Sequence, residues 1–255
     1  LKNIVRLGGS ASKLHLLLLL AAVNMDEQAL THLKALLESM VYYSTVNQIK
    51  TNELERLYAQ WCKQIREIHT DEELTSFIND KIRPTISQWK VNNRSNFMRI
   101  GFDSMQQYRV KFILARITKY VDVRRKNGGD ASNVAEFYEG GIEIEHIMPQ
   151  KYSAAYGISE DDYNAAKQRL GNLTLLEKTI NASIGDDAFA SKSEAYRQSA
   201  YYLTRSIAQL DDVGQQTAIN RMNQKLRSWS SWGPSLIEDR QAILYDLSEE
   251  IWSID

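Results

Sequence analysis

The feature that most restricts the fold of this chain is the spacing of its apolar side chains, which recur every three or four residues. Six stretches carry this pattern: residues 25–46, 51–69, 70–82, 105–126, 186–210 and 234–252. This period gathers the apolar side chains on one face of an α-helix. Glycine and proline are scarce, at 12 and 3 of 255 residues, whereas a β-sandwich or barrel needs many turns. The sequence therefore predicts a mainly α-helical fold.

The period changes after a polar, glycine-containing break at residues 127–133. Residues 133–147 alternate apolar and polar around Glu139-Gly140-Gly141, which predicts two short strands joined by a hairpin turn. Residues 172–177 predict a third short strand. We therefore expect a helical domain over residues 1–130, and over residues 131–255 a second domain with a small β-hairpin element and C-terminal packing helices.

Charge is distributed unevenly, although the net charge is only -1. Residues 84–130 hold 10 Lys and Arg against 3 Asp and Glu, an excess of seven. On the long helix expected there, Arg109, Arg116 and Lys119 fall on one stripe. Such a stripe is either a solvated face or a surface that holds a polyanion such as DNA.

The chain shows no sign of a membrane segment or of disulfide bonding. Its longest apolar run, Leu16–Val23, is far shorter than the roughly 18 residues that a membrane span needs. Cys62 is the single cysteine, so no internal disulfide can form. We therefore expect a cytoplasmic protein with no membrane partner. The start of the chain carries no signal-peptide pattern or initiating methionine, and we expect a fragment of a longer protein.

The segment GIEIEHIMPQ, residues 141–150, combines an alternating strand pattern with an acid–histidine pair, Glu145-His146. A lone histidine at a strand end is usually structural, and the scattered histidines with one cysteine make no zinc site. If His146 acts chemically, it does so as a base beside a metal held by oxygen ligands. The later segment GNLTLLEKTINAS supplies Asn172 and Asn181. Glu145 and Asn181 suit Mg²⁺ or Mn²⁺, with Asn172 or Asp186 as the alternative to Asn181.

Three segments together, IEHIMPQ, LGNLTLLEKTINASIG and FASKSEAY, resemble the HNH endonucleases of the ββα-metal type. More narrowly, they are similar to the DUF1524 domain of GmrSD-type modification-dependent restriction and phage-defence proteins. The resemblance is clearest over residues 142–200. It implies a ββα-metal core beside a helical bundle, and a metal-dependent DNA endonuclease, expected to act as a nickase, on phage or modified DNA. In such proteins this domain usually accompanies an N-terminal DUF262 nucleotide-hydrolysing domain.

The resemblance also implies a role for each site residue. His146 corresponds to the general base, and Glu145 before it to a metal ligand. Asn172 corresponds to the asparagine that braces the histidine loop, and Asn181 to the second metal ligand. Asparagine at this last position still allows Mg²⁺, and the cysteines of the zinc knuckle found in some relatives are missing.

Further cations flank the expected site, and each of them is as consistent with a solvated helix face as with a DNA contact. They are Lys178, Lys192 and Arg197. Trp229 and Trp232 are expected to pack the last helix against the nuclease lobe. The alternative function is a catalytically inactive helical module that binds DNA or a protein partner. Cleavage of RNA is a third possibility.

Overall fold

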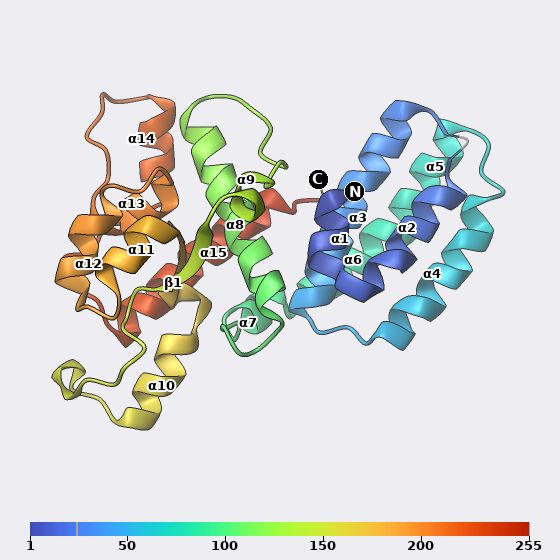
Figure 1. The fold of residues 1–255 in the computed structure, drawn as a ribbon. Coiled ribbons are helices and arrows are strands. Elements are labelled where there is room, and N and C mark those ends of the chain that lie inside the picture. The colour runs from blue at the N-terminus through green and yellow to red at the C-terminus, as the bar shows by residue number, and fades with distance from the viewer. Residues whose placement is uncertain (24, 255) are drawn as a thin grey trace. The chain divides into compact units, whose positions relative to one another are not determined.

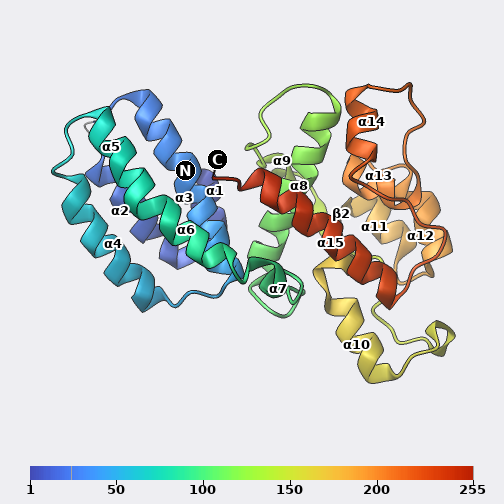
Figure 2. The same cartoon turned by 180° about the vertical axis from the view of Figure 1, so that it is seen from behind.

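A computed structural model describes residues 1–23 and 25–254 of the chain, apart from the side chain of residue 10. They form two compact units: unit 1 holds residues 1–97 with the last few residues from Trp252 onward, and unit 2 holds Met98–Ile251. Figures 1 and 2 show the elements of each unit from opposite sides. The mainly helical fold with a small β element is confirmed.

Unit 1 consists of helices joined by turns and short loops, with no strand among its described residues. Its helices are α1 (Lys2–Gly8), α2 (Ser12–Ala21), α3 (Glu27–Val46), α4 (Thr51–Ile65), α5 (Asp71–Phe77), α6 (Arg83–Lys90) and α7 (Asn93–Phe97), with a 3₁₀ turn at Gly9–Ala11 and a π-helical turn at Ile78–Ile82. Side chains cap the starts of α3, through Asp26, and of α5. Thr70 and Glu73 form a reciprocal capping box at the start of α5, which satisfies backbone N–H groups that the first turn leaves unpaired.

Unit 2 contains the only two strands among the described residues. Its elements are α8 (Gln107–Arg125), α9 (Glu136–Glu139), β1 (Ile142–His146), α10 (Glu160–Gln168), β2 (Leu173–Glu177), α11 (Lys178–Ile184), α12 (Phe189–Tyr196), α13 (Tyr202–Ala208), α14 (Ala218–Asn223) and α15 (Pro234–Ile251), with 3₁₀ turns at Ala154–Tyr156 and Leu170–Asn172. Figure 2 shows α15 running past β2.

The two strands pair antiparallel, with Ile142 opposite Glu177 and His146 opposite Leu173. The hairpin turn predicted at Glu139-Gly140-Gly141 is wrong, because residues 136–139 form the short helix α9. The partner of β1 is instead β2, the strand predicted over residues 172–177. A loop and helix α10 separate the two strands along the chain, so the pairing is long-range.

The boundary between the units lies at Phe97/Met98 and not at the predicted 130/131. The reason is α8, which packs against β2, α13, α14 and α15 and therefore belongs to unit 2. Most of α8 is buried, including Phe112, Ile113 and Ile117. The basic segment is thus largely built into unit 2 and does not form the edge of a separate helical domain.

Among residues 1–23 and 25–254, no helix is both long enough and apolar enough to cross a membrane.

Candidate active site

The acid–histidine pair occupies the last two positions of β1. Glu145 faces Thr174 and His146 faces Leu173 across the sheet. Beyond the strand, the Ile147 N–H still donates to the Asn172 carbonyl at 2.9 Å, and the chain then leaves the sheet toward Pro149. The strand therefore ends at His146, as a site that uses both neighbouring side chains requires.

Asn172 ties the start of β2 to the loop that follows His146. Its side-chain oxygen accepts from the Met148 N–H at 2.7 Å and from the Trp232 indole N–H at 2.9 Å. Its amide nitrogen donates to the carbonyls of Met148 at 3.3 Å and Lys167 at 2.9 Å. The side chain is fully buried. Asn172 is thus placed to position the histidine loop and not to touch a reacting atom.

Helix α15 holds the chain on both sides of Asn172. The buried guanidinium of Arg240 donates to the carbonyls of Gly171 and Leu173, both at 2.8 Å. The Gln241 side-chain oxygen accepts from the Gly171 N–H at 3.1 Å. Burial lowers the pKa of Arg240 to about 9, so the group stays charged at neutral pH. The position of Asn172 is therefore set by contacts from a distant helix.

The Glu145 carboxylate is held by two side chains of α12. Lys192 Nζ lies 2.7 Å from Glu145 Oε1, and the Tyr196 hydroxyl donates to the same oxygen at 2.9 Å. Lys192 also donates to the His146 carbonyl at 2.7 Å. Burial raises the pKa of Glu145, whereas the Lys192 ammonium and the Tyr196 hydroxyl oppose this rise. Lys192 is 1% exposed, so it clamps the acid–histidine pair instead of reaching the solvent as the predicted DNA contact would require.

His146 is buried, and its ring packs edge-on against Phe102 with 5.0 Å between centroids. Its Nε2 atom has no hydrogen-bond partner in the structure. Burial lowers the pKa of His146 to about 4, and the charges of Lys192 and Lys167 act in the same direction. The imidazole is therefore neutral at pH 7. A neutral imidazole with a nitrogen that has no hydrogen-bond partner can accept a proton.

Asn181, on α11, contacts a residue that was not among the predicted site residues. Its amide nitrogen donates to Glu143 Oε2 at 2.9 Å. Glu143 and Glu145 are two apart on β1 and so share a face of the strand, which also puts Asn181 on that face. The alternation of GIEIEH marks Glu143 as a neighbour of Glu145, and this is the signal in the sequence that could have identified it.

The donor chemistry of this face fits a hard divalent cation. Carboxylate and carboxamide oxygens are the ligands that Mg²⁺ and Mn²⁺ prefer. Glu143 and Glu145 carry such oxygens on this face, but Glu145 Oε1 already accepts from Lys192 and Tyr196, and the Asn181 amide nitrogen contacts Glu143. Within residues 1–23 and 25–254, no group of three or more His, Cys, Asp or Glu is arranged to hold a metal. Cation binding would thus depend on the Asn181 amide as well as on carboxylates.

The cations predicted to contact DNA lie in different environments. Arg116 is buried and bonds to the Ala131 carbonyl, which argues against a contact with phosphate. Lys119 pairs with Glu136 at 3.0 Å. Arg109 lies over the Tyr108 ring at 5.7 Å. The three do not form one open basic stripe, because the buried side of α8 takes up Arg116.

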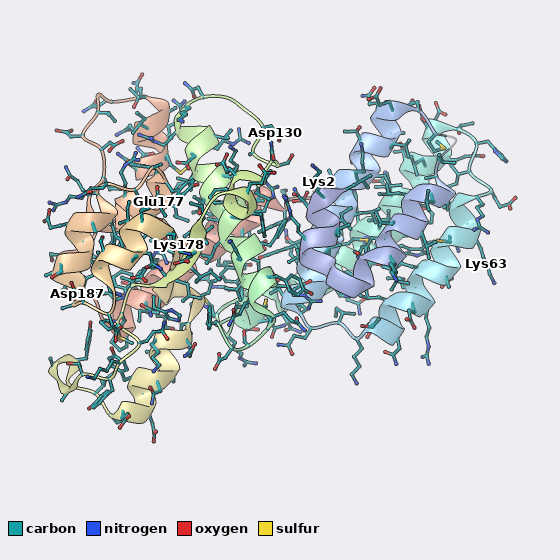
Figure 3. The ribbon with its side chains drawn as sticks, in the orientation of Figure 1. Lys2, Lys63, Asp130, Glu177, Lys178 and Asp187 are labelled. Atoms are coloured by element: carbon teal, nitrogen blue, oxygen red, sulfur yellow. The ribbon has the colours of Figure 1, made fainter. Side chains whose placement is uncertain are left out.

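The two remaining cations, Lys178 and Arg197, are exposed. Lys178 begins α11 directly after β2, where Figure 3 shows it next to Glu177. Arg197 pairs with Glu194 at 2.8 Å on the surface. A surface pair of this kind is weak and can exchange for a phosphate. These two residues are the sequence-predicted cations best placed to meet DNA.

Most of unit 2 is similar to a known protein family. A family model described as "GmrSD restriction endonucleases, C-terminal domain" matches residues 89–247, a range that includes every residue of the candidate site. No curated protein is significantly similar to the chain.

Proposed function

This chain belongs to the GmrSD restriction endonuclease family through the C-terminal domain, and we propose that it hydrolyses phosphodiester bonds of DNA by an HNH-type reaction with His146 as general base. The observation that supports this most is the buried, unpartnered Nε2 of His146, held at a strand end by contacts from Asn172 and Lys192. In the full-length protein we expect an N-terminal DUF262-type domain to act with it.

Each group of the site has a distinct part in the proposed reaction. Neutral His146 takes a proton from the attacking water through Nε2. A bound phosphodiester brings negative charge toward the imidazole, which raises its pKa toward the range in which a general base works best. Lys192 and Asn172 fix the backbone at His146 and at Met148, two residues further on. Mg²⁺ or Mn²⁺ at Glu145 and Asn181 would supply stabilisation of negative charge on the scissile phosphate.

A nicking assay on supercoiled plasmid tests this function. With Mg²⁺ or Mn²⁺ we expect open-circular DNA to appear before linear DNA, because one site cuts one strand. His146→Ala should lose about 10²–10⁴-fold in rate, the usual contribution of a general base. His32→Ala, at an exposed position in unit 1, is the matched control and should cut normally.

Two results would contradict the proposal. One is full activity in excess EDTA, and the other is parental activity in His146→Ala prepared free of contaminating nuclease. DNA binding without cleavage under all metal conditions would favour the inactive binding module instead. An RNA substrate in the same assay decides whether cleavage is restricted to DNA.

A further inference from the structure

Beside the His146 loop, unit 2 contains a hollow of about 720 Å³. Its lining comes from three segments, residues 149–156, 186–190 and 230–234. Four of the lining side chains are aromatic: Tyr152, Tyr156, Phe189 and Trp232. This volume lies within the range of about 300–1,000 Å³ that is usual for small-molecule sites.

Residues that line this hollow form hydrogen bonds with the loop after His146 and with Asn172. Both oxygens of Asp186 accept from the backbone after Pro149, from Gln150 N–H at 2.6 Å and Lys151 N–H at 2.9 Å. On the other side, the Trp232 indole N–H donates to Asn172 at 2.9 Å. The hollow and the His146 loop therefore share structural elements, and a ligand in one lies close to the other.

The lining combines aromatic rings, of which Tyr152 and Tyr156 are partly exposed, with polar side chains. Phe189 and Trp232 are stacked at 5.5 Å with an interplanar angle of 23°. Tyr156 meets Tyr163 edge to face, and it remains partly exposed. Hydroxyl groups of Ser153 and Ser231 also line the space. Aromatic surfaces combined with a few polar groups are the usual environment of a bound heteroaromatic ring.

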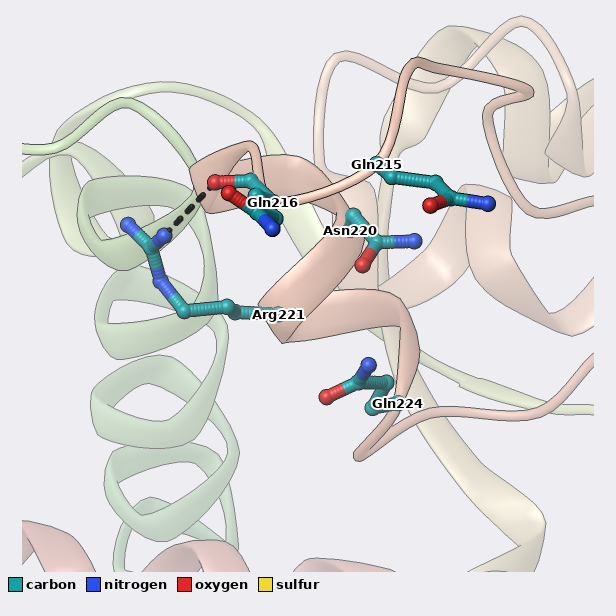
Figure 4. Close-up of a pocket in the computed structure, with 5 residues that line it drawn as sticks. All are labelled: Gln215, Gln216, Asn220, Arg221 and Gln224. Atoms are coloured by element: carbon teal, nitrogen blue, oxygen red, sulfur yellow. Dashed lines mark hydrogen bonds between the residues drawn. The ribbon is translucent and has the colours of Figure 1, made fainter.

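A second hollow, of about 660 Å³, has a different character (Figure 4). It is lined by Gln215, Gln216, Asn220, Arg221 and Gln224, so it offers amides in place of aromatic rings. Arg221 donates to the Gln216 carbonyl at 2.8 Å. None of the candidate site residues lines it. The aromatic hollow is therefore the one whose chemistry and position both point to a ligand of the reaction.

We propose that the aromatic hollow receives one unstacked nucleobase of the strand that is cut, with Tyr156 as its stacking platform. The proposal rests on the proposed function, since it takes the substrate to be DNA. A base held there anchors the strand next to His146 and restricts the position of the adjacent phosphodiester. Unstacked bases occur in single strands and at flipped positions of a duplex. The site therefore favours substrates in which a base leaves the stack easily.

Binding of a dinucleotide, d(TpT), in EDTA tests the proposal without cleavage. The readout is the ¹H–¹⁵N signal of the Trp232 indole, assigned by its loss in Trp232→Phe. We expect d(TpT) to shift this signal, and the same phosphodiester lacking both bases to leave it unchanged. Tyr156→Ala should weaken d(TpT) binding by roughly tenfold, as expected for one base–aromatic stack. Tyr156→Phe keeps the ring and should bind like the parent.

A control variant shows whether the effect is particular to the hollow. Tyr108→Ala removes an exposed tyrosine of α8 and should bind d(TpT) like the parent. The amide spectrum of each variant shows that it is folded. Equal binding of the base-free compound, or parental affinity in Tyr156→Ala, would overturn the proposal. Base binding in a protein that does not nick plasmid would instead overturn the proposed function and leave the nucleobase site standing.

Discussion

The Lys192–Glu145 pair is the residue-level contact on which the geometry of the site depends most. Both side chains are almost fully buried, at 1% and 8% exposed. Lys192→Met leaves a buried carboxylate without its cation, which typically costs about 3–5 kcal/mol. We therefore expect a loss of this size in the free energy of unfolding, measured by urea denaturation.

A double-mutant cycle checks that the loss comes from this pair. Glu145→Gln combined with Lys192→Met removes both charges and should be more stable than the sum of the two single changes indicates. Tyr196→Phe removes one hydrogen bond and should cost only about 1 kcal/mol. Strict additivity of the two single changes would show that the charges do not act on each other.

The sequence indicates candidate site residues but not the groups that these residues contact. Spacing and residue type single out Glu145, His146, Asn172 and Asn181, and the structure gathers them around β1 and β2. The sequence does not reveal that Asn181 bonds to Glu143, or that Lys192 clamps Glu145. Strand alternation gives the face on which a side chain lies, but contacts across 38 or 47 residues depend on how α11 and α12 pack.

At the scale of elements, the strand predicted over residues 133–139 is wrong for a physical reason. Val134 and Phe137 are fully buried and three residues apart, a spacing that places both on one face of a helical turn but on opposite faces of a strand. The pair of glycines that follows is nevertheless typical of a hairpin turn, and it led to the strand prediction. The antiparallel partner of β1 is instead set by α15, which fixes the start of β2 through Arg240 and Gln241.

Gly171 is where this helix comes closest to the strand, and it provides a test of that contact. A Cβ atom at Gly171 would lie 2.0 Å from the Ile237 carbonyl oxygen and 3.0 Å from the Gln241 backbone nitrogen. Gly171→Ala must therefore push α15 away, and overpacking of this kind costs about 3 kcal/mol. We expect this loss in urea unfolding, together with reduced cleavage because Asn172 shifts.

The matched control is Gly128→Ala, in the loop after α8. A Cβ atom there has no neighbour within 4 Å. Its unfolding free energy should stay within about 0.5 kcal/mol of the parent. If Gly171→Ala were equally harmless, the close approach of α15 to the strand would not hold in solution.

At the scale of the whole molecule, composition and period predict the helical class correctly, but they do not locate the division between the units. The excess of positive charge over residues 84–130 predicts a basic surface there. Of the ten cations in this segment only Arg116 is buried, on the covered side of helix α8, and the others are exposed or partly exposed. Net charge is a sum over a segment, whereas exposure depends on the elements that cover it.

The stability of unit 1 is expected to depend on pH through His15. Burial lowers the pKa of His15 to about 4, from 6.5 in the unfolded chain. The unfolded state thus binds more protons between these values, so stability falls as pH drops from 6.5 to 4. The loss at pH 4 is roughly 3 kcal/mol. His15→Leu should flatten this part of the pH–stability curve in urea unfolding, whereas the exposed His32→Leu should retain it.

We expect DNA to contact the exposed cations of unit 2, and the salt dependence of binding reports how many phosphates are held. Each neutralised phosphate releases condensed counterions, which gives a log–log slope of about 0.9 per contact on duplex DNA. Replacing Lys178 and Arg197 together by alanine should therefore lower the slope by about 2 and weaken all duplex sequences alike. Binding is measured in EDTA, by fluorescence anisotropy of a labelled duplex at several salt concentrations.

The matched control removes the same charge from outside the range that the family model matches. Lys2 and Lys63 are exposed cations of unit 1 (Figure 3). Their double replacement by alanine should leave the slope unchanged if the DNA path runs over α11 and α12. An equal fall in both double variants would mean that phosphate contacts are spread over both units. A fall in the Lys2/Lys63 variant alone would place the phosphate contacts on unit 1 and would contradict the assignment to Lys178 and Arg197.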